Sequence, residues 1–475
     1  MAEAVETPNI QLHNNIEQRI FIGHGNTKEE EEGVKRHLIL KPDEATHMLI
    51  LGPSGFWKTA FMRALIQELW HTTWGQHNEK PLILVFERKY DKSKAILVRE
   101  TFYELLDKYS EAGLEKRLPN YKDFLVYIYL LEHSGQKILV GNEERTVRVG
   151  LMGDFALAWP NILGLKKRSK GNTLLGHFGL KPEAYPMRRI VFNPTRDLKD
   201  IALDSGPTAE VTTGYLRYKH LNYREVARFT TIPLSSIYGR EIEERWDYRR
   251  MRDPDEVIRD AYIELIQKAG KDAKKSTYMG VKSVMTLLKR SKILIKNDDK
   301  RQDIFQIIDN DKINVIDFSQ NSQLTEKEEL LIFKKVIDYA IDEFARKRDT
   351  AVFVFVDEVQ NYLRDKWGWY AVNKLFREGR SNQVALITAT QYLHRLPHDL
   401  VYGATHIAIM GALASKTDFQ ILNNLIEDFD EKYEKIVARS PLELEKLKKK
   451  YRGRGYFSYN KFYTERIFFR PSQTL

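Results

Sequence analysis

The chain has 475 residues, of which 30% are charged, with a formal net charge of +10 and no cysteine. The length predicts two or three domains with enough buried surface for stability, and the lack of cysteine excludes disulfide scaffolds, thiolate metal sites and thiol catalysis. The positive charge mildly favours an anionic partner such as nucleic acid, the alternative being an ordinary solvated surface.

The N-terminal sequence MAEAVETPNIQLHNNIEQRI lacks the basic start and the apolar run of a signal peptide. No later run reaches the 18 apolar residues of a membrane span. We therefore expect a soluble, cytoplasmic protein with no transmembrane segment. Residues 1–35, which end in the acidic run EEEEGVK, are expected to form an N-terminal extension.

A phosphate-binding loop is predicted after the first apolar strand. From Gly52 the sequence G-P-S-G-F-W-K-T follows the template G-x-x-x-x-G-K-[ST], but Trp57 replaces the second glycine. The run MLIL before it predicts a strand and KTAFMRALIQELW after it predicts an amphipathic helix, which is the context that such a loop requires. The residues expected to cradle the nucleotide are Gly52, Pro53, Ser54, Gly55, Phe56, Trp57, Lys58 and Thr59.

Within this loop, Lys58 would reach the β- and γ-phosphates of ATP, and the hydroxyl of Thr59 would coordinate Mg²⁺. The alternative is a simple turn of Gly, Pro and Ser followed by a solvated lysine. Glycine allows backbone angles and a close approach to phosphate that a bulky residue avoids. We therefore predict that Trp57 permits nucleotide binding but slows turnover.

Six short apolar runs predict the strands of a parallel sheet that is buried on both faces. They span residues 47–52, 81–87, 313–319, 351–358, 384–391 and 405–411. Helix-like sequences such as EKEELLIFKKVIDYAIDEFARKR alternate with them, so the fold class is α/β. The sequence GYFSYNKFYTERIFFR at 455–470 predicts a final hairpin.

The chain between these groups of strands is rich in Lys, Arg and Tyr and predicts helices. We expect the first part of the core over 36–100, a mostly helical inserted domain over 101–302, and the second part of the core with its hairpin over 303–475. Two basic segments, 271–301 and KLKKKYRGR at 446–454, would suit the wall of a DNA channel. A solvated helix face is the simpler interpretation of each.

Two adjacent carboxylates, Asp357 and Glu358, follow the apolar run AVFVFV. At the end of a buried strand they are costly unless they meet a cation or transfer a proton. Asp357 would then hold Mg²⁺ and Glu358 would activate the attacking water. A helix N-cap with an acidic neighbour is the alternative, and the phosphate loop makes catalysis the better interpretation.

Polar residues surround the next strand, 384–391. Gln391 follows it at the sheet edge where ligands bind, so it would sense the γ-phosphate or orient the water; a turn-forming glutamine is the alternative. Arg377 and Arg380 precede the strand. Either could act as an arginine finger across a subunit boundary, although arginines on helix surfaces are commoner.

The successive motifs MLILGPSGFWKT, INVIDFS, VFVFVDEVQNYL and REGRSNQVALITATQ resemble those of the HerA/FtsK superfamily of RecA-like P-loop ATPases. The resemblance covers about 36–100 and 303–411, with a similar terminal hairpin. It implies a RecA-like core and a homo-oligomeric, usually hexameric ring that moves double-stranded DNA. It also implies phosphate and metal roles for Lys58 and Thr59, metal and water-activating roles for Asp357 and Glu358, and a sensor role for Gln391.

Three functions are compatible with these features. The first is an ATP-driven DNA translocase acting in conjugative transfer, genome packaging or DNA processing. The second is a nucleotide-binding assembly subunit in which Trp57 has made hydrolysis slow or absent. The third is a DNA-binding structural protein with a vestigial phosphate loop. Peripheral protein partners are compatible with each.

Overall fold

A computed structural model describes most of the chain outside the N-terminus and the middle of the first half. The described residues are 17–25, 34–41, 46–75, 77–88, 90–91, 137–140, 143–146, 152–153, 155–159, 161, 174–206, 208–268, 274–320, 323–378, 383–413, 415–427, 429, 436–438, 440–451 and 453–474. Arg380 and most of the N-terminal extension lie outside them.

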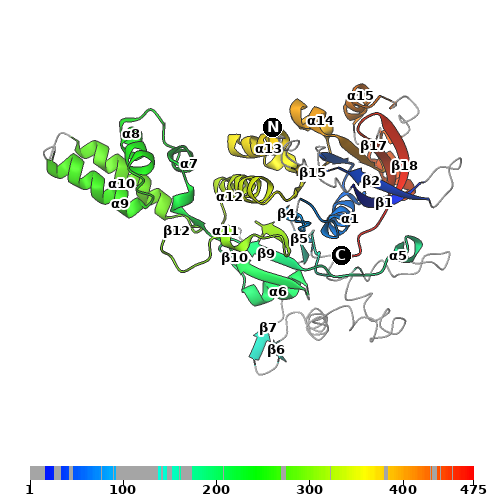
Figure 1. Cartoon of the computed structure of the whole chain (residues 1–475), viewed down its shortest axis with the longest axis horizontal. Helices are drawn as coiled ribbons and strands as arrows, with labels where there is room; N and C mark the ends of the chain where they lie inside the picture. The colour runs from blue at the N-terminus through cyan, green and yellow to red at the C-terminus, as the bar shows by residue number, and fades with distance from the viewer. Residues whose placement is uncertain are drawn as a thin grey trace, which may run out of the picture.

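A twelve-stranded sheet forms the centre of the described structure (Figure 1). Eight neighbouring strands are parallel: β10 (Ala209–Thr213), β9 (Met187–Val191), β13 (Ile313–Asp317), β4 (Leu82–Glu87), β14 (Val352–Asp357), β15 (Val384–Thr390), β3 (Met48–Leu51) and β16 (His406–Met410). Four antiparallel strands continue the sheet: β17 (Arg454–Tyr459), β18 (Tyr463–Phe469), β1 (Gln18–Gly25) and β2 (Lys35–Leu40). Across the sheet the strand order is β10-β9-β13-β4-β14-β15-β3-β16-β17-β18-β1-β2.

The predicted α/β class with a mostly parallel sheet is confirmed, since the six predicted strands correspond to β3, β4, β13, β14, β15 and β16. Two further strands, β9 and β10, lie inside the range 101–302. The sequence MRRIV of β9 escaped detection because Arg188 and Arg189 interrupt its apolar pattern. Both arginines are buried in ion pairs, which lets a charged sequence enter the sheet.

Helices cover both faces of the sheet. On β3, the side chains of Met48 and Ile50 join a core with α1 (Lys58–Trp70), while Leu49 and Leu51 join a core with α12 (Glu326–Tyr339) and α13 (Lys366–Glu378). This alternation is the period-two pattern of a strand that is buried on both sides. It fixes α1, which follows the phosphate loop, on one face and the other two helices opposite.

Further elements belong to the described structure. The helices are α5 (Leu174–His177), α6 (Leu198–Ser205), α7 (Tyr223–Phe229), α8 (Ile237–Glu243), α9 (Pro254–Tyr262), α10 (Lys275–Lys289), α11 (Ile304–Ile307), α14 (His398–Gly403), α15 (Lys416–Leu425) and α16 (Pro441–Tyr451), with π-helical turns at Glu244–Tyr248, Ile263–Lys268 and Ala340–Lys347. Three small ladders pair β5 (Tyr90–Asp91) with β8 (Met152–Gly153), β6 (Lys137–Val140) with β7 (Glu143–Thr146), and β11 (Leu216–Arg217) with β12 (Leu294–Ile295). Among the described helices, none combines the length and the apolar character needed to cross a membrane.

Helices α7 to α10 form a unit that projects away from the sheet (Figure 1). Trp246 is fully buried at its centre and donates through Nε1 to the Leu221 carbonyl oxygen at 2.8 Å. The buried Arg245 pairs with Glu241, which lies four residues earlier, and with Glu264 in the π-helical turn after α9. This unit lies within the range 101–302, and the same range also supplies β9 and β10 to the sheet.

Candidate functional site

The strand order brings the predicted motifs to one edge of the sheet. β15 lies between β3 and β14, with Ala389 paired to Ile50 on one side and to Asp357 on the other. Because the three strands are parallel, their carboxyl ends meet at the same edge. The phosphate loop after β3, the acidic pair at the end of β14 and Gln391 after β15 are therefore neighbours.

The start of the phosphate loop requires glycine. The Gly52 amide donates to the Thr390 carbonyl oxygen at 3.2 Å, and a Cβ on Gly52 would lie 2.6 Å from the carbonyl oxygen of Met410. Gly55 has a φ of 83°, in the left-handed region that favours glycine. Both predicted glycines are thus explained by the backbone of the loop.

Trp57 adopts the conformation that the missing glycine would allow. Its φ is 72° and its ψ is 17°, a left-handed geometry that costs a non-glycine residue about 1–2 kcal/mol. A Cβ on Gly453 would lie 3.0 Å from two ring carbons of Trp57, so the indole packs beside the chain just before β17. The loop therefore retains its backbone path, and the indole is directed toward the terminal hairpin.

The remaining loop residues divide between the core and the site. The Phe56 side chain is buried against Gly411, while Pro53 is buried and Ser54 is exposed. Lys58 is buried, and its Nζ donates to the Pro53 carbonyl oxygen at 3.1 Å across the loop. A side chain in this position lies beside the backbone that would face a phosphate.

A hydrogen bond joins the two predicted halves of the site. The Thr59 Oγ1 atom donates to Asp357 Oδ2 at 3.2 Å, although 298 residues separate them in the sequence. Hydroxyl and carboxylate oxygens are the ligands that Mg²⁺ prefers. The fold therefore brings together Thr59 and Asp357, the two residues expected to hold the metal.

Glu358 is 7% exposed and also has a left-handed backbone, with a φ of 54° and a ψ of 55°. Its Oε1 atom accepts a hydrogen bond from Gln391 Nε2 at 2.8 Å, which places the predicted sensor against the predicted base. Its Oε2 atom accepts from Gln360 Nε2. Gln360 was missed from the sequence, although its position two residues after Glu358 is a signal that a short turn could bring the two together.

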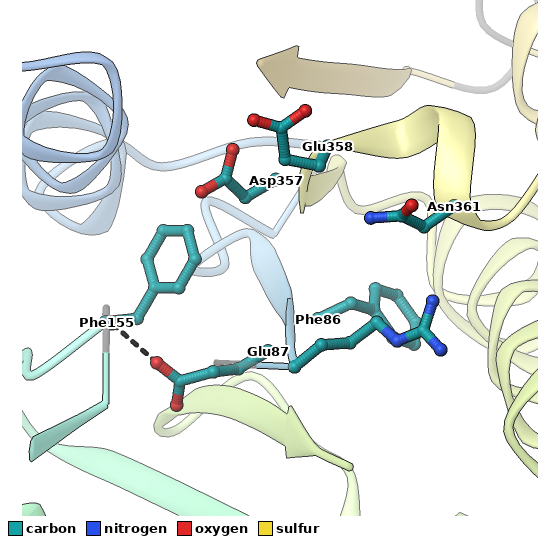
Figure 2. Close-up of a pocket in the computed structure, with 7 residues that line it drawn as sticks. Phe86, Glu87, Phe155, Asp357, Glu358 and Asn361 are labelled. Atoms are coloured by element: carbon teal, nitrogen blue, oxygen red, sulfur yellow. Dashed lines mark hydrogen bonds between the residues drawn. The ribbon is translucent and has the colours of Figure 1, made fainter. Parts of the chain in front are cut away.

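A small cavity opens beside the acidic pair (Figure 2). Its lining residues come mainly from the ends of β4 and β14: Phe86, Glu87, Arg88, Phe155, Asp357, Glu358 and Asn361. Figure 2 shows the carboxylates of Asp357 and Glu358 on one side of this space and the Asn361 amide directed toward it. Only Asp357 and Glu358 among these residues were predicted.

A second group of carboxylates lies at the same sheet edge. Glu87 ends β4 and Asp317 ends β13, and Arg189 NH1 approaches Glu87 Oε2 at 2.5 Å and Asp317 Oδ2 at 2.6 Å. All three side chains are at most 1% exposed. Glu87 Oε1 also accepts from the Phe155 amide at 2.7 Å. The two carboxylates share one guanidinium and serve to hold strands together.

An ion pair lies at the rim of the cavity. Arg88 NH2 is 2.5 Å from Glu329 Oε2 at the start of α12, and its guanidinium lies 5.4 Å from the ring centre of Tyr362. Burial raises the pKa of Glu329 to about 7, while the charge of Arg88 acts in the opposite direction. The charge of Arg88 thus offsets only part of the cost of burying an ionised Glu329 carboxylate.

Arg377 does not join this group. Arg377 is exposed in the last turn of α13, just before β15 begins, and so lies toward the opposite edge of the sheet from Gln391. It therefore stays a prediction as a residue that acts on a neighbouring subunit. Arg380 lies outside the described residues.

The basic segment 271–301 is partly neutralised. In 271–301, Lys289 and Lys296 pair with Asp255, and Arg301 pairs with Asp299. One exposed face of α10 has a hollow, with two basic residues among its lining residues Met279, Lys282, Ser283, Thr286, Leu287 and Arg290. The segment is thus a mixed surface in which a minority of the basic groups face a concavity.

No family model matches the sequence, and no curated protein matches it. Several solved structures align with the chain. VirB4 of Thermoanaerobacter pseudethanolicus is 13% identical over 94% of this chain and 95% of its own, with a TM-score of 0.42. The plasmid coupling protein TrwB in complex with the GTP analogue GDPNP is 12% identical over 90% and 85%, with a TM-score of 0.37.

The genome packaging NTPase B204 from Sulfolobus turreted icosahedral virus 2, in complex with ATP-gammaS, is 14% identical over 33% of this chain and 67% of its own, with a TM-score of 0.22. The three proteins are members of the superfamily of P-loop ATPases that the sequence motifs resemble. At such identities and TM-scores, the likeness by itself carries no conclusion about the activity of this chain.

Proposed function

We propose that this protein is an ATP-hydrolysing ring motor of the HerA/FtsK type that binds and translocates double-stranded DNA. The main support is the contact between Thr59 Oγ1 and Asp357 Oδ2, because it joins the phosphate loop to the acidic strand end. A turn with a solvated lysine and a capped helix elsewhere would not require this contact. Conjugative transfer, genome packaging and DNA processing are the settings in which such a motor would act.

In this function the loop residues hold the nucleotide. The backbone amides between Gly52 and Lys58 face the phosphates, and Lys58 exchanges its contact with the Pro53 carbonyl oxygen for the β- and γ-phosphate oxygens. Thr59 and Asp357 provide the oxygen ligands of Mg²⁺, which neutralises phosphate charge when bound.

Hydrolysis transfers the γ-phosphoryl group to water. The water oxygen forms a bond to the γ-phosphorus while the bond from that phosphorus to the β–γ bridging oxygen breaks, which leaves ADP and phosphate. Glu358 takes a proton from the water, and Gln391, which now touches Glu358, orients the water or senses the γ-phosphate. Arg377 or Arg380 is the finger that a neighbouring subunit would supply.

Double-stranded DNA is the proposed partner, and the exposed face of α10 is the surface where a backbone contact is best supported. Lys282 and Arg290 line the hollow on that face, and cations of this kind bind phosphates without sequence preference. The homo-oligomer, proposed to be a hexameric ring, would place several such faces around one duplex.

An ATPase assay with and without duplex DNA tests this function. We expect hydrolysis that DNA stimulates and that Lys58→Ala abolishes. The matched control is Lys347→Ala, because this lysine pairs with Glu343 and lies outside the phosphate loop and both basic segments. Hydrolysis that DNA does not change would contradict the translocase.

A second candidate is a nucleotide-binding assembly subunit with slow or no hydrolysis. It is favoured by the left-handed Trp57 and by a Glu358 carboxylate that accepts hydrogen bonds on both oxygens. ATP binding by calorimetry without measurable hydrolysis would support it. Under the motor hypothesis, Trp57→Gly should raise kcat because the loop regains its freedom beside the phosphates.

A further inference from the structure

The carboxylate of Glu358 has two amide partners that differ in their attachment to the fold. Gln360 lies two residues further along, in the short 3-10 turn Val359–Asn361 that follows β14. Gln391 lies 33 residues away, after the end of β15. One partner therefore moves with Glu358, and the other belongs to a different strand.

From this difference we infer that Gln360 is a positioning residue for hydrolysis. It anchors Oε2 of Glu358, while Gln391 exchanges Oε1 for the terminal phosphate of a bound nucleotide and so frees Oε1 to accept the proton of water. The inference rests on the proposed ATPase function and assigns the regulation of its general base to two glutamines.

The orientation of the Gln360 amide is fixed by its own partner. Thr390 Oγ1 lies 3.3 Å from Gln360 Oε1, and its hydroxyl can donate to that carbonyl oxygen. The Nε2 group is then the end that faces Glu358, where an N–H can donate to the carboxylate. Thr390 also accepts the Gly52 amide through its backbone oxygen, so the anchor is connected to the start of the phosphate loop.

The backbone of Glu358 shows that this arrangement is held against strain. A left-handed non-glycine residue persists only where its surroundings fix it. Here the Glu358 amide donates to the Ala389 carbonyl oxygen at 2.9 Å, and the Asn361 amide donates to the Glu358 carbonyl oxygen at 3.0 Å. The main chain is held on both sides, and the side chain is then held by Gln360.

Gln391 is the partner suited to exchange. It follows Thr390, whose carbonyl oxygen contacts the Gly52 amide, so it lies beside the loop that would hold the phosphates. A phosphate oxygen, like a carboxylate oxygen, is an ionised acceptor that can form a charge-assisted hydrogen bond with an amide N–H. Before nucleotide binds, both oxygens of Glu358 accept hydrogen bonds, so the carboxylate is not free to take a proton from water.

The experiment compares Gln360→Met with Gln320→Met in the full chain. Methionine keeps the side-chain length and removes the amide donor. Gln320 is the matched control, since its Nε2 also donates to a carboxylate at this sheet edge, Asp317 Oδ2, at 3.2 Å. We expect Gln360→Met to lower kcat about tenfold while the ATP dissociation constant and the melting temperature stay close to wild type. Gln320→Met should leave kcat unchanged.

Gln360→Glu gives an independent readout if the methionine variant does not fold. The introduced carboxyl group can donate to Glu358 only when protonated and repels it when ionised. The ratio of its kcat to that of wild type should therefore rise as the pH falls from 8 to 6, whereas damage to the fold alone would lower the ratio equally at both pH values.

Wild-type hydrolysis with an equal kcat for Gln360→Met would overturn this inference and leave the proposed function in place. A pH-independent ratio for Gln360→Glu would have the same meaning. Absence of hydrolysis by the wild type, with and without duplex DNA, would overturn the proposed function and the inference together.

Discussion

Two pairs of carboxylates lie at the same edge of the sheet and are held in different ways. Glu87 and Asp317 share the buried guanidinium of Arg189. Asp357 accepts from the hydroxyl of Thr59, and Glu358 accepts from the amides of two glutamines. A fixed cation commits a carboxylate to structure, whereas a neutral donor can be exchanged for a metal ion, a phosphate or a water molecule.

The largest effect that tests this comparison is expected for Glu358→Gln. The variant keeps the shape of the side chain and loses the base, so kcat should fall by about 10²–10⁴-fold with ATP binding retained. Steady-state kinetics and calorimetry measure both quantities. Glu87→Gln, the same change in the other pair, should keep kcat within the same order of magnitude. Equal losses of kcat in the two variants would abolish the distinction.

Arg189→Met tests the other side of the comparison. It leaves Glu87 and Asp317 buried without their shared cation, which should lower the free energy of unfolding by about 3–5 kcal/mol. Urea denaturation measures the change.

The control for this variant is Arg188→Met on the same strand. The side chain of Arg188 is 10% exposed, and its partners Asp309 and Glu210 are 37% and 47% exposed, so water can solvate them. We expect a clearly smaller loss of stability. If both substitutions lowered the free energy of unfolding by similar amounts, the buried carboxylates Glu87 and Asp317 would have no special structural role.

The acidic pair of the candidate site could be predicted from the sequence, whereas its structural counterpart could not. Asp357 and Glu358 stand together after an apolar strand beside a recognisable phosphate loop. Glu87 and Asp317 lie 230 residues apart, and each ends a separate strand. Only the parallel pairing of β4 with β13 brings them together, and pairing between distant strands leaves no local signal.

The same reasoning separates the predicted strands from those that were missed. The apolar runs of β3, β4, β14 and β15 carry the signature of strands that are buried on both faces. In β9, burial depends on Arg188 and Arg189, whose partners come from other segments. Gln360 was missed for a related reason, since its contact with Glu358 depends on the left-handed turn at Glu358.

The ion pair at the cavity rim offers a smaller test, which depends on pH. The pKa of Glu329 is about 7 in the folded protein against 4.5 for an ordinary glutamate, so the folded state holds the proton more tightly. This carboxylate therefore costs no stability below pH 4.5 and destabilises the fold increasingly as the pH rises through 7.

Glu329→Gln removes this titrating group. The variant should gain stability relative to wild type between pH 5 and pH 8, by about 1 kcal/mol, because Arg88 and nearby water offset part of the cost. Arg88→Met should make the loss of stability with rising pH steeper than in wild type. Thermal denaturation across this pH range measures both, and a wild type whose stability rises instead would show that Arg88 fully compensates the carboxylate.

The smallest expected effect concerns the other strained residue of the site. Glu358 keeps its left-handed backbone with polar contacts, whereas Trp57 keeps its own through apolar packing beside Gly453. Trp57→Gly and Trp57→Ala both remove the indole and differ only in the Cβ atom. Because glycine tolerates a φ of 72°, the glycine variant should be more stable by about 1 kcal/mol. At the exposed helical residue Lys282 the order should reverse, with alanine more stable than glycine by about 1 kcal/mol. Chemical denaturation measures both pairs of variants. If the alanine variant were the more stable one at position 57 as well as at position 282, the backbone at position 57 would not have the left-handed conformation that favours glycine.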